Sequence, residues 1–197
     1  VGDELGAPIA IAAPLPGERE RPCELVTRPI DENHAVQLGR FLELAAGLEF
    51  TVPAEGATHL HFDADPLCDA GVIANLVRYF SRHREALRER FETNPRCSRL
   101  GDWPPELLER VEEPAFAELP WPEARERLAG IPLTKYCDFN LVNIVRRHPA
   151  KHTFEVRILP VRTEAASVIE AAHYFNDILD WARGGVGRLL KVPERLR

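Results

Sequence analysis

Two short stretches of the chain, about a hundred residues apart, alternate between apolar and polar positions. This alternation predicts β-strands. The first stretch runs Thr58-His59-Leu60-His61-Phe62. Successive side chains of a strand point to opposite faces of its sheet. We therefore predict that His59 and His61 share one face, while Leu60 and Phe62 occupy the other.

The second stretch runs Thr153-Phe154-Glu155-Val156-Arg157. The same rule places Glu155 and Arg157 on one face, with Phe154, Val156 and Ile158 packed beneath them. If both strands belong to one sheet, its apolar side covers a core and its polar side carries imidazole, carboxylate and guanidinium groups. Such a surface is suited to holding a metal ion and an anion.

Apolar residues at helical spacing predict helices between these strands. The longest starts at Asp65-Pro66, where a capping carboxylate precedes proline at the first helical position, and it continues to about residue 91. Another starts at Asp31 as N-cap and ends at Gly47. Further helices are predicted over 105–113, 122–129 and Glu164 to Arg183, where Gly184-Gly185 ends the last one.

The remaining strands are predicted from short apolar runs bounded by turn residues. They cover Ile9–Ala13, 23–27 and 48–52, and the last is joined to 57–63 by a turn at Pro53–Gly56. Lys135–Arg146 and Thr153–Pro160 are predicted to form a β-hairpin around His148-Pro149-Ala150.

This order, with paired strands separated by helices, favours an α+β fold with a mainly antiparallel sheet and helices packed on one face. The length of 197 residues predicts a single domain, 1–197. Its core covers about 23–183, after an irregular segment 1–22 and before a basic tail 184–197.

Composition narrows the class of protein. A net charge of −6 argues against general nucleic-acid binding. No apolar run reaches the ~20 residues needed to span a bilayer, and no leader opens the chain, so we expect a cytoplasmic protein without a membrane partner. The cysteines are widely spaced and form no C-x-x-C, which predicts reduced, mostly buried thiols: Cys23, Cys68, Cys97 and Cys137.

Several side chains are candidates for chemistry. Glu24, in a short apolar strand, is either an edge-strand glutamate facing water or a ligand for a hard cation. The pair His59 and His61 is compatible with a zinc site, a nucleotide site or a surface pair. Glu155 and Arg157 form either an ion pair or a divided site, in which the carboxylate binds a metal and the guanidinium binds an anion.

Other candidates lie in the connections. Lys135 and Asn140 precede the second strand and could orient a polar ligand or mark irregular backbone. Arg96 and Arg99, in the loop after the long helix, are either solvated or meet an anionic substrate. The sequence has no P-loop, no G-x-G-x-x-G, no G-x-S-x-G and no H-E-x-x-H, so the enzyme classes that depend on those motifs gain no support.

Taken in order, these segments resemble the amidoligase family, whose members are similar to glutamine synthetase and glutamate–cysteine ligase. The resemblance spans about residues 23–160. It rests on Glu24 to Pro29, Thr58 to Phe62, Arg96 to Arg99, Lys135-Tyr136 through Asn140, and Thr153 to Arg157.

The resemblance implies a glutamine-synthetase-like catalytic domain that uses ATP and Mg²⁺ to join a small-molecule or peptide carboxylate to an amine through an acyl phosphate. It implies metal ligands at Glu24, His59 and Glu155. His61 and Arg157 would act in catalysis at the phosphates and the transferred phosphoryl group. Contacts to ATP or substrate are implied for His61, Arg96, Arg99, Lys135, Asn140 and Arg157.

The family pattern opens with a strand carrying Glu-x-Glu, and this sequence has only the adjacent pair Asp3-Glu4. We therefore expect a chain that lacks the first strand of its family. The alternatives are a catalytically degenerate, amidoligase-like interaction domain, or a zinc-dependent hydrolase that uses His59 and His61 with a third ligand.

Overall fold

A computed structural model describes residues 10–14, 23–27, 29, 33–147 and 151–184 of the chain. The chain divides into two compact units. The first unit comprises Val1–Gly56 with Val161–Ala171, and the second comprises Ala57–Pro160 with Ala172–Arg197. Each unit contains its own antiparallel sheet.

Among the described residues, the first unit contains a two-stranded sheet, helix α1 (His34–Gly47) and the first part of α6 (Ala165–Ala182). Strand β1 (Ala10–Pro14) pairs antiparallel with β2 (Cys23–Thr27), with Ile11 opposite Val26. Both strands and helix α1 were predicted from sequence and are confirmed, while the predicted N-cap Asp31 lies outside the described residues.

The predicted strand at 48–52 is wrong. The backbone N–H groups of Leu48 and Phe50 donate to the carbonyl oxygens of Leu44 and Ala45, at the end of α1, instead of to a neighbouring strand. Glu49 between them has a positive φ of 58°. The end of the helix thus takes the hydrogen bonds that a sheet would need.

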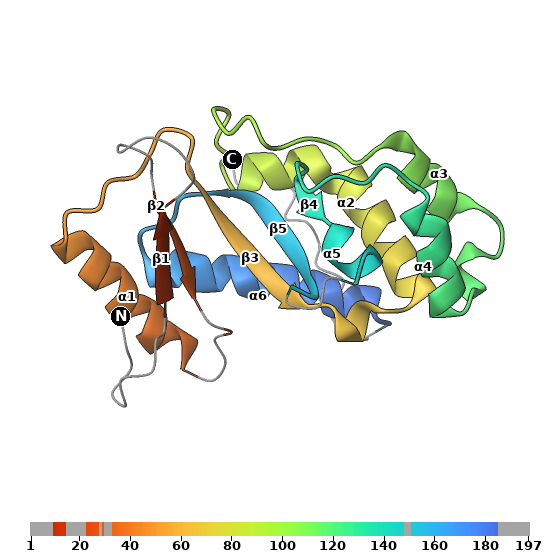
Figure 1. The fold of residues 1–197 in the computed structure, drawn as a ribbon, viewed down its shortest axis with the longest axis horizontal. Coiled ribbons are helices and arrows are strands. Elements are labelled where there is room, and N and C mark those ends of the chain that lie inside the picture. The colour runs from red at the N-terminus through yellow and green to blue at the C-terminus, as the bar shows by residue number, and fades with distance from the viewer. Residues whose placement is uncertain (1–9, 15–22, 28, 30–32, 148–150, 185–197) are drawn as a thin grey trace. The chain divides into compact units, whose positions relative to one another are not determined.

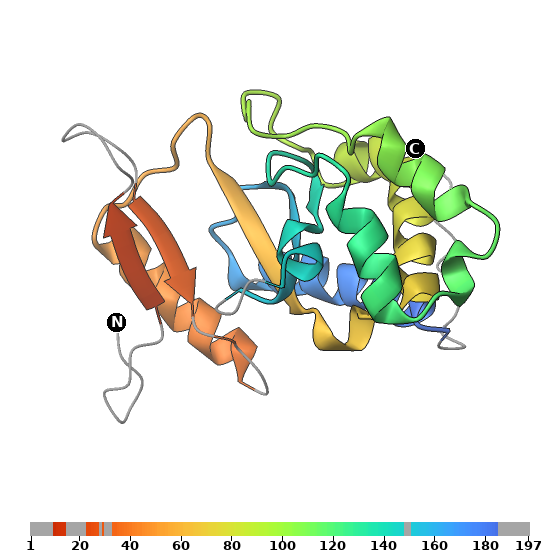
Figure 2. The same ribbon diagram turned by 45° about the vertical axis from the view of Figure 1, so that its right-hand side comes forward.

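The second unit is organised around a three-stranded sheet in the order β3-β5-β4, visible in Figure 1 and from another side in Figure 2. Strand β3 covers Ala57–Asp63, β5 covers Thr153–Pro160 and β4 covers Phe139–Asn140. Both pairings are antiparallel, and a bulge interrupts the first between Thr58 and Leu60.

An aromatic cluster forms the core beneath this sheet. Phe80 lies 4.1 Å from Phe139 and 5.5 Å from Phe154, measured between ring centroids. Phe175 packs against the same cluster. These contacts place helices α2 (Ala70–Arg90) and α6 (Ala165–Ala182) against the apolar face of the sheet, which confirms the predicted α+β class.

The smaller helices of this unit are short. They are η1 (Asp65–Leu67), α3 (Pro105–Glu112), η2 (Phe116–Glu118), α4 (Trp121–Ala129) and α5 (Val142–Val145). Of these, α3, η2 and α4 begin at a proline or within two residues after one. The helices predicted at 105–113, at 122–129 and at the end of the chain are confirmed. Gly184 follows α6 with a φ of +80°, as expected for a residue that ends a helix.

The long helix begins later than the sequence predicts. Asp65-Pro66 opens only the 3₁₀ turn η1, and the chain then bends at Cys68. Asp69 has the extended backbone of an N-cap, and its carboxylate accepts a 3.0 Å hydrogen bond from the backbone N–H of Val72. Asp65 lies inside η1, whose N-cap is Ala64, so of the two aspartates Asp69 alone caps a helix.

The predicted hairpin is correct in its second strand and mostly wrong in its first. Of Lys135–Arg146, only β4 pairs with β5. The amide oxygen of Asn140 accepts a hydrogen bond from the backbone N–H of Val142, and the chain turns there into α5. The predicted turn at 148–150 lies outside the described residues.

Cys68, Cys97 and Cys137 are free thiols, as predicted. Only Cys137 of these is buried, whereas Cys68 and Cys97 are half-buried, so the prediction of mostly buried thiols holds for one of the three. Among the described residues, no helix combines the length and apolar character required to cross a membrane.

Candidate active site

The polar face of the β3-β5-β4 sheet converges on one carboxylate, Glu155 of β5. The register that pairs His61 of β3 with Glu155, and Asn140 of β4 with the same residue, places all three side chains together. Glu155 is 6% exposed. A charge this deeply buried requires partners of opposite charge or strong hydrogen-bond donors.

Four side chains supply those partners. Arg157 donates from Nη1 to Oε1 of Glu155 at 2.7 Å, and Asn140 donates from Nδ2 to Oε2 at 2.7 Å. Nδ1 of His59 lies 3.2 Å from Oε1, and Nε2 of His61 lies 3.7 Å from it. The sequence prediction that the two imidazoles, the acid and the guanidinium share one face is confirmed.

The partners determine the charge of Glu155. Burial raises the pKa of its carboxyl, but the hydrogen bonds from His59 and Asn140 and the positive charge of Arg157 outweigh burial and lower the pKa to about 2. The carboxylate is therefore ionised throughout the physiological range.

Arg157 keeps unused capacity for an anion. The residue is 8% exposed, and its Nε has no hydrogen-bond partner among the described residues. A buried donor without a partner is uncommon, because it loses its hydrogen bonds to water without replacement. The sequence allowed either an ion pair between Glu155 and Arg157 or a site divided between a metal and an anion. The ion pair is present, and the Nε of Arg157 can still donate a hydrogen bond to an anion.

His61 is oriented by a neighbour on the opposite strand. Its Nδ1 lies 2.9 Å from the hydroxyl of Thr153, which leaves Nε2 facing the carboxylate. Partial burial lowers the pKa of His61, and the nearby carboxylate of Glu155 opposes this shift only in part. The imidazole is accordingly neutral at pH 7, able to donate or accept a hydrogen bond at Nε2.

A second buried carboxylate, that of Asp138, lies next to the Glu155 cluster and was not identified from the sequence. Asp138 accepts hydrogen bonds from Arg84 Nε at 2.7 Å, Arg88 Nη1 at 3.1 Å and the backbone N–H of Gly101 at 3.1 Å. Its carbonyl oxygen accepts from the backbone N–H of Arg157 at 2.9 Å. The i, i+4 spacing of the two helical arginines was the available signal for a shared anionic partner.

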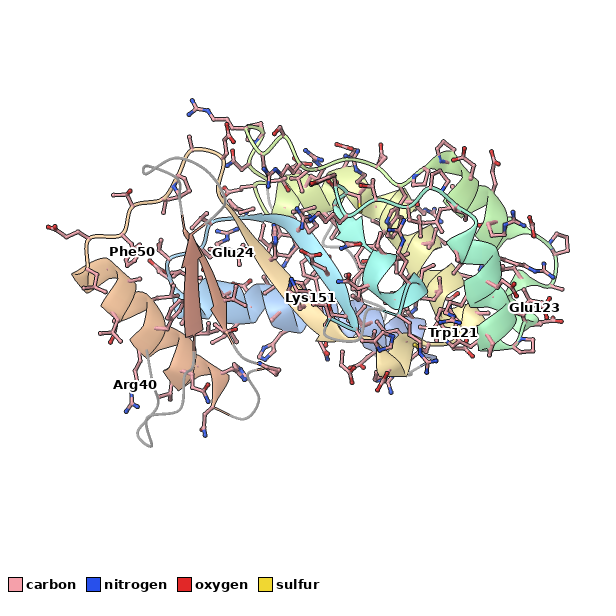
Figure 3. All side chains as sticks on the ribbon, in the orientation of Figure 1. Glu24, Arg40, Phe50, Trp121, Glu123 and Lys151 are labelled. Carbon is pink, nitrogen blue, oxygen red and sulfur yellow. The ribbon has the colours of Figure 1, made fainter. Side chains whose placement is uncertain are left out.

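Of the remaining predicted residues, Asn140 joins the Glu155 cluster, whereas Glu24, Arg96, Arg99 and Lys135 have no described contact with it. Arg96, Arg99 and Lys135 are exposed and form no hydrogen bond or ion pair with it among the described residues. The side-chain amide of Asn140 donates to Glu155 and accepts from the backbone N–H of Val142. Glu24, labelled in Figure 3, lies on β2 in the first unit, and its side chain is exposed.

With this geometry described, the comparison with known families is informative. Residues 10–179 match the model of a family described as "Putative amidoligase enzyme". The chain belongs to this amidoligase family. Membership supports a ligase-type enzyme in general and agrees with the resemblance read from the sequence. No curated protein and no solved structure matches the chain.

In this member of the amidoligase family, the described residues contain no group of three or more His, Cys, Asp or Glu side chains arranged to hold a metal ion. A magnesium ion bound together with a nucleotide does not need such a group, because one or two carboxylates, phosphate oxygens and water complete its coordination. Glu155, ionised and flanked by two imidazoles, is the carboxylate that fits this requirement.

Proposed function

We propose that this chain is an ATP- and Mg²⁺-dependent carboxylate–amine ligase with a glutamine-synthetase-like catalytic domain. The observation that supports the proposal is the ionised carboxylate of Glu155, which lies between two imidazoles and beside a buried guanidinium whose Nε has no partner in the described part of the chain. Family membership adds the reaction class, because an amidoligase forms amide bonds.

The reaction requires an activated acid. An oxygen of the substrate carboxylate attacks the γ-phosphorus of ATP, the bond to ADP breaks, and an acyl phosphate forms. The amine nitrogen then attacks the acyl carbon, phosphate leaves, and the nitrogen loses a proton to give the amide. Negative charge accumulates on the phosphoryl oxygens during transfer, so fixed cations and hydrogen-bond donors lower the barrier.

Each residue of the cluster has a role in this scheme. Arg157 directs its spare N–H toward the transferred phosphoryl group or the substrate carboxylate. His61, fixed by Thr153 and neutral, donates from Nε2 to a phosphate oxygen. Glu155 and His59 would hold magnesium, which when bound neutralises the charge of the phosphates. Asn140 positions Glu155 through its amide.

The decisive experiment follows oxygen atoms from the acid to phosphate. A library of carboxylic acids labelled with ¹⁸O is incubated with the protein, ATP, Mg²⁺ and a mixture of amines, and the released phosphate is analysed by mass spectrometry. An acyl phosphate transfers one ¹⁸O from the carboxylate to phosphate. Unlabelled phosphate from a productive acid would overturn the acyl-phosphate mechanism.

Matched variants connect the activity to the site. Glu155→Gln should lower the rate at least about 100-fold, because the variant loses the charge that holds the metal and orients Arg157. Glu123→Gln, which changes an exposed glutamate of α4 (Figure 3), should leave the rate unchanged. If Glu155→Gln lowers only stability, the chain is a non-catalytic interaction domain.

A further inference from the structure

A second cluster of reactive side chains lies where β3 ends and β5 begins. Antiparallel pairing sets Asp63 opposite Thr153, and the backbone N–H of Ala64 donates to the carbonyl oxygen of His152 at 3.2 Å. The segment after β3, which carries Asp65 and Cys68, is therefore held against the residue that precedes β5. The side chains of Asp65, Cys68 and His152 do not belong to the Glu155 cluster.

His152 lies between a carboxylate and a thiol. Its Nδ1 is 3.0 Å from Oδ1 of Asp65, and its Nε2 is 3.8 Å from Sγ of Cys68. A base within reach of a nucleophile, with the base oriented by a third group, is the arrangement that activates cysteine and serine nucleophiles in acyl transfer. In this structure the thiol of Cys68 donates its hydrogen bond to the carbonyl oxygen of Ala64, at 3.3 Å, and the imidazole lies further from the sulfur.

This group opens into a pocket of about 230 Å³. Besides the three reactive side chains, the pocket is lined by Trp121, Pro122 and Arg125 of α4 and by Arg147, and Figure 3 shows Trp121 at the start of that helix. Within the described part of the chain, neither guanidinium forms a side-chain hydrogen bond or ion pair. An indole, a proline ring and two guanidinium groups suit a ligand with an apolar body and a carboxylate.

The thiol needs its base. Burial raises the pKa of Cys68, the carboxylates of Asp65 and Asp63 raise it further, and Arg147 and Arg125 lower it only in part. The sulfur is therefore protonated at neutral pH. A protonated thiol becomes a nucleophile when a neighbouring imidazole removes its proton as the new bond forms.

We propose that Cys68, His152 and Asp65 form a second catalytic site, which hydrolyses esters or amides whose acyl group carries a carboxylate. Sγ of Cys68 attacks the acyl carbon as its proton passes to Nε2 of His152. The alcohol or amine leaves with that proton, so an acyl thioester remains on Cys68. Water then attacks the thioester, gives a proton to His152 and releases the acid, after which the proton returns to sulfur.

The roles within the site differ. Cys68 is the nucleophile and His152 the general base. Asp65, which acts through its contact with the imidazole, is a positioning residue, and Arg125 and Arg147 bind the carboxylate of the acyl group.

The test uses two aryl esters that differ by one methyl group and one negative charge: mono-4-nitrophenyl adipate and its methyl ester. The assay contains EDTA and neither ATP nor Mg²⁺, so its outcome is independent of the ligase proposal. We expect nitrophenolate release from the free acid at least about 10-fold faster than from the methyl ester, since only the acid reaches a charged partner. Equal rates would overturn the assigned substrate class.

A measurement on the unmodified protein locates the acyl group without relying on any variant. After an acid quench, peptide mapping should find the adipoyl group on Cys68 in preference to Cys97, which is also half-buried and lies between Arg96 and Arg99 in sequence. An equal distribution between the two cysteines would reject Cys68 as the nucleophile, and so would release no faster than in buffer.

Variants then separate the roles. Cys68→Ser and His152→Gln should each slow acylation at least about 100-fold, whereas Cys97→Ser should not change it. Asp65→Asn should lower kcat much more than it changes KM, because the carboxylate acts by orienting the imidazole of His152. A change in KM alone for Asp65→Asn would contradict the positioning role.

Discussion

Glu155 provides the first prediction at the scale of single residues. The pKa of its carboxyl is about 2 in the folded protein, against 4.5 for an unperturbed group. Between these values the unfolded chain binds the proton and the folded chain does not, so stability is present above about pH 5 and is lost as the pH falls toward 2. The loss amounts to about 3 kcal/mol of the free energy of unfolding.

Urea unfolding across this pH range measures the effect. The substitution Glu155→Gln should remove the pH-dependent step and cost about 3 kcal/mol at pH 7, because it leaves the Arg157 guanidinium buried without its anion. Near pH 2 the variant and the unmodified protein should be almost equally stable. A constant difference between them at every pH would mean that the carboxylate is not ionised in the folded state.

His61 reports on the same contact from the other strand. Burial lowers its pKa below 6.5, while the nearby Glu155 raises it. Removing the negative charge in Glu155→Gln should therefore lower the pKa of His61 further. Heteronuclear NMR titration of the imidazole measures this directly, with Glu123→Gln as the control that leaves the pKa of His61 unchanged. An upward movement in the Glu155 variant would contradict the geometry.

Sequence alone predicted these contacts because strand alternation depends on local geometry. Once β3 and β5 are paired with the correct faces, His59, His61, Glu155 and Arg157 meet. It did not predict that Asn140 would bond to Glu155, since that contact depends on the register of a two-residue strand. Nor did it reveal Cys68 beside His152, which lies 84 positions further along the chain.

At the scale of elements, Asp138 connects α2 to the start of β4. Two arginines of the helix, Arg84 and Arg88, donate to its buried carboxylate, and its carbonyl oxygen accepts from Arg157 on β5. A helix, a loop and a strand therefore meet at one residue. The polar face of the sheet depends on this connection for its position.

We expect Asp138→Asn to lower the free energy of unfolding by about 2 kcal/mol, since the two half-buried guanidinium groups lose their shared charged acceptor. The matched control is Glu112→Gln, which removes the exposed partner of Arg78 in α2 and should cost no more than about 0.5 kcal/mol. Chemical denaturation of both variants provides the comparison. Equal effects would show that Asp138 acts as a surface ion pair.

The elements that the sequence misplaced share a cause. The sequence offers two aspartates, Asp65 and Asp69, as candidate caps for α2, but Asp65 begins only the 3₁₀ turn η1 and Asp69 caps the helix. The apolar run before Arg146 fits a strand, but the side chain of Asn140 offers the backbone of Val142 a helical alternative. Each choice depends on hydrogen bonds that single-sequence periodicity does not contain.

At the scale of the whole molecule, buried apolar side chains are unevenly divided between the two units. Apart from Phe41, Val168 and Ala171, every buried hydrophobic residue of the described chain lies in the unit formed by Ala57–Pro160 and the chain after Ala171. The first unit instead exposes several large apolar side chains: Val26, Val36, Leu44, Leu48, Phe50 and Val52. Composition and length gave no indication of this division, since burial depends on tertiary packing.

This division predicts a large difference in local stability within one chain. Backbone amides open locally where few apolar contacts resist the opening, and only on global unfolding where the core holds them. Amides of β5 and of α2 around Phe80 should therefore exchange with solvent at least about 100-fold more slowly than those of α1, when hydrogen exchange is followed by mass spectrometry at neutral pH.

Asp138→Asn should accelerate exchange in α2 and β5 and leave α1 unchanged, because its contacts lie wholly within the second unit. Uniform protection across α1, α2 and β5 would mean that the chain unfolds as one cooperative body, and that the apolar side chains exposed in the first unit are buried in solution.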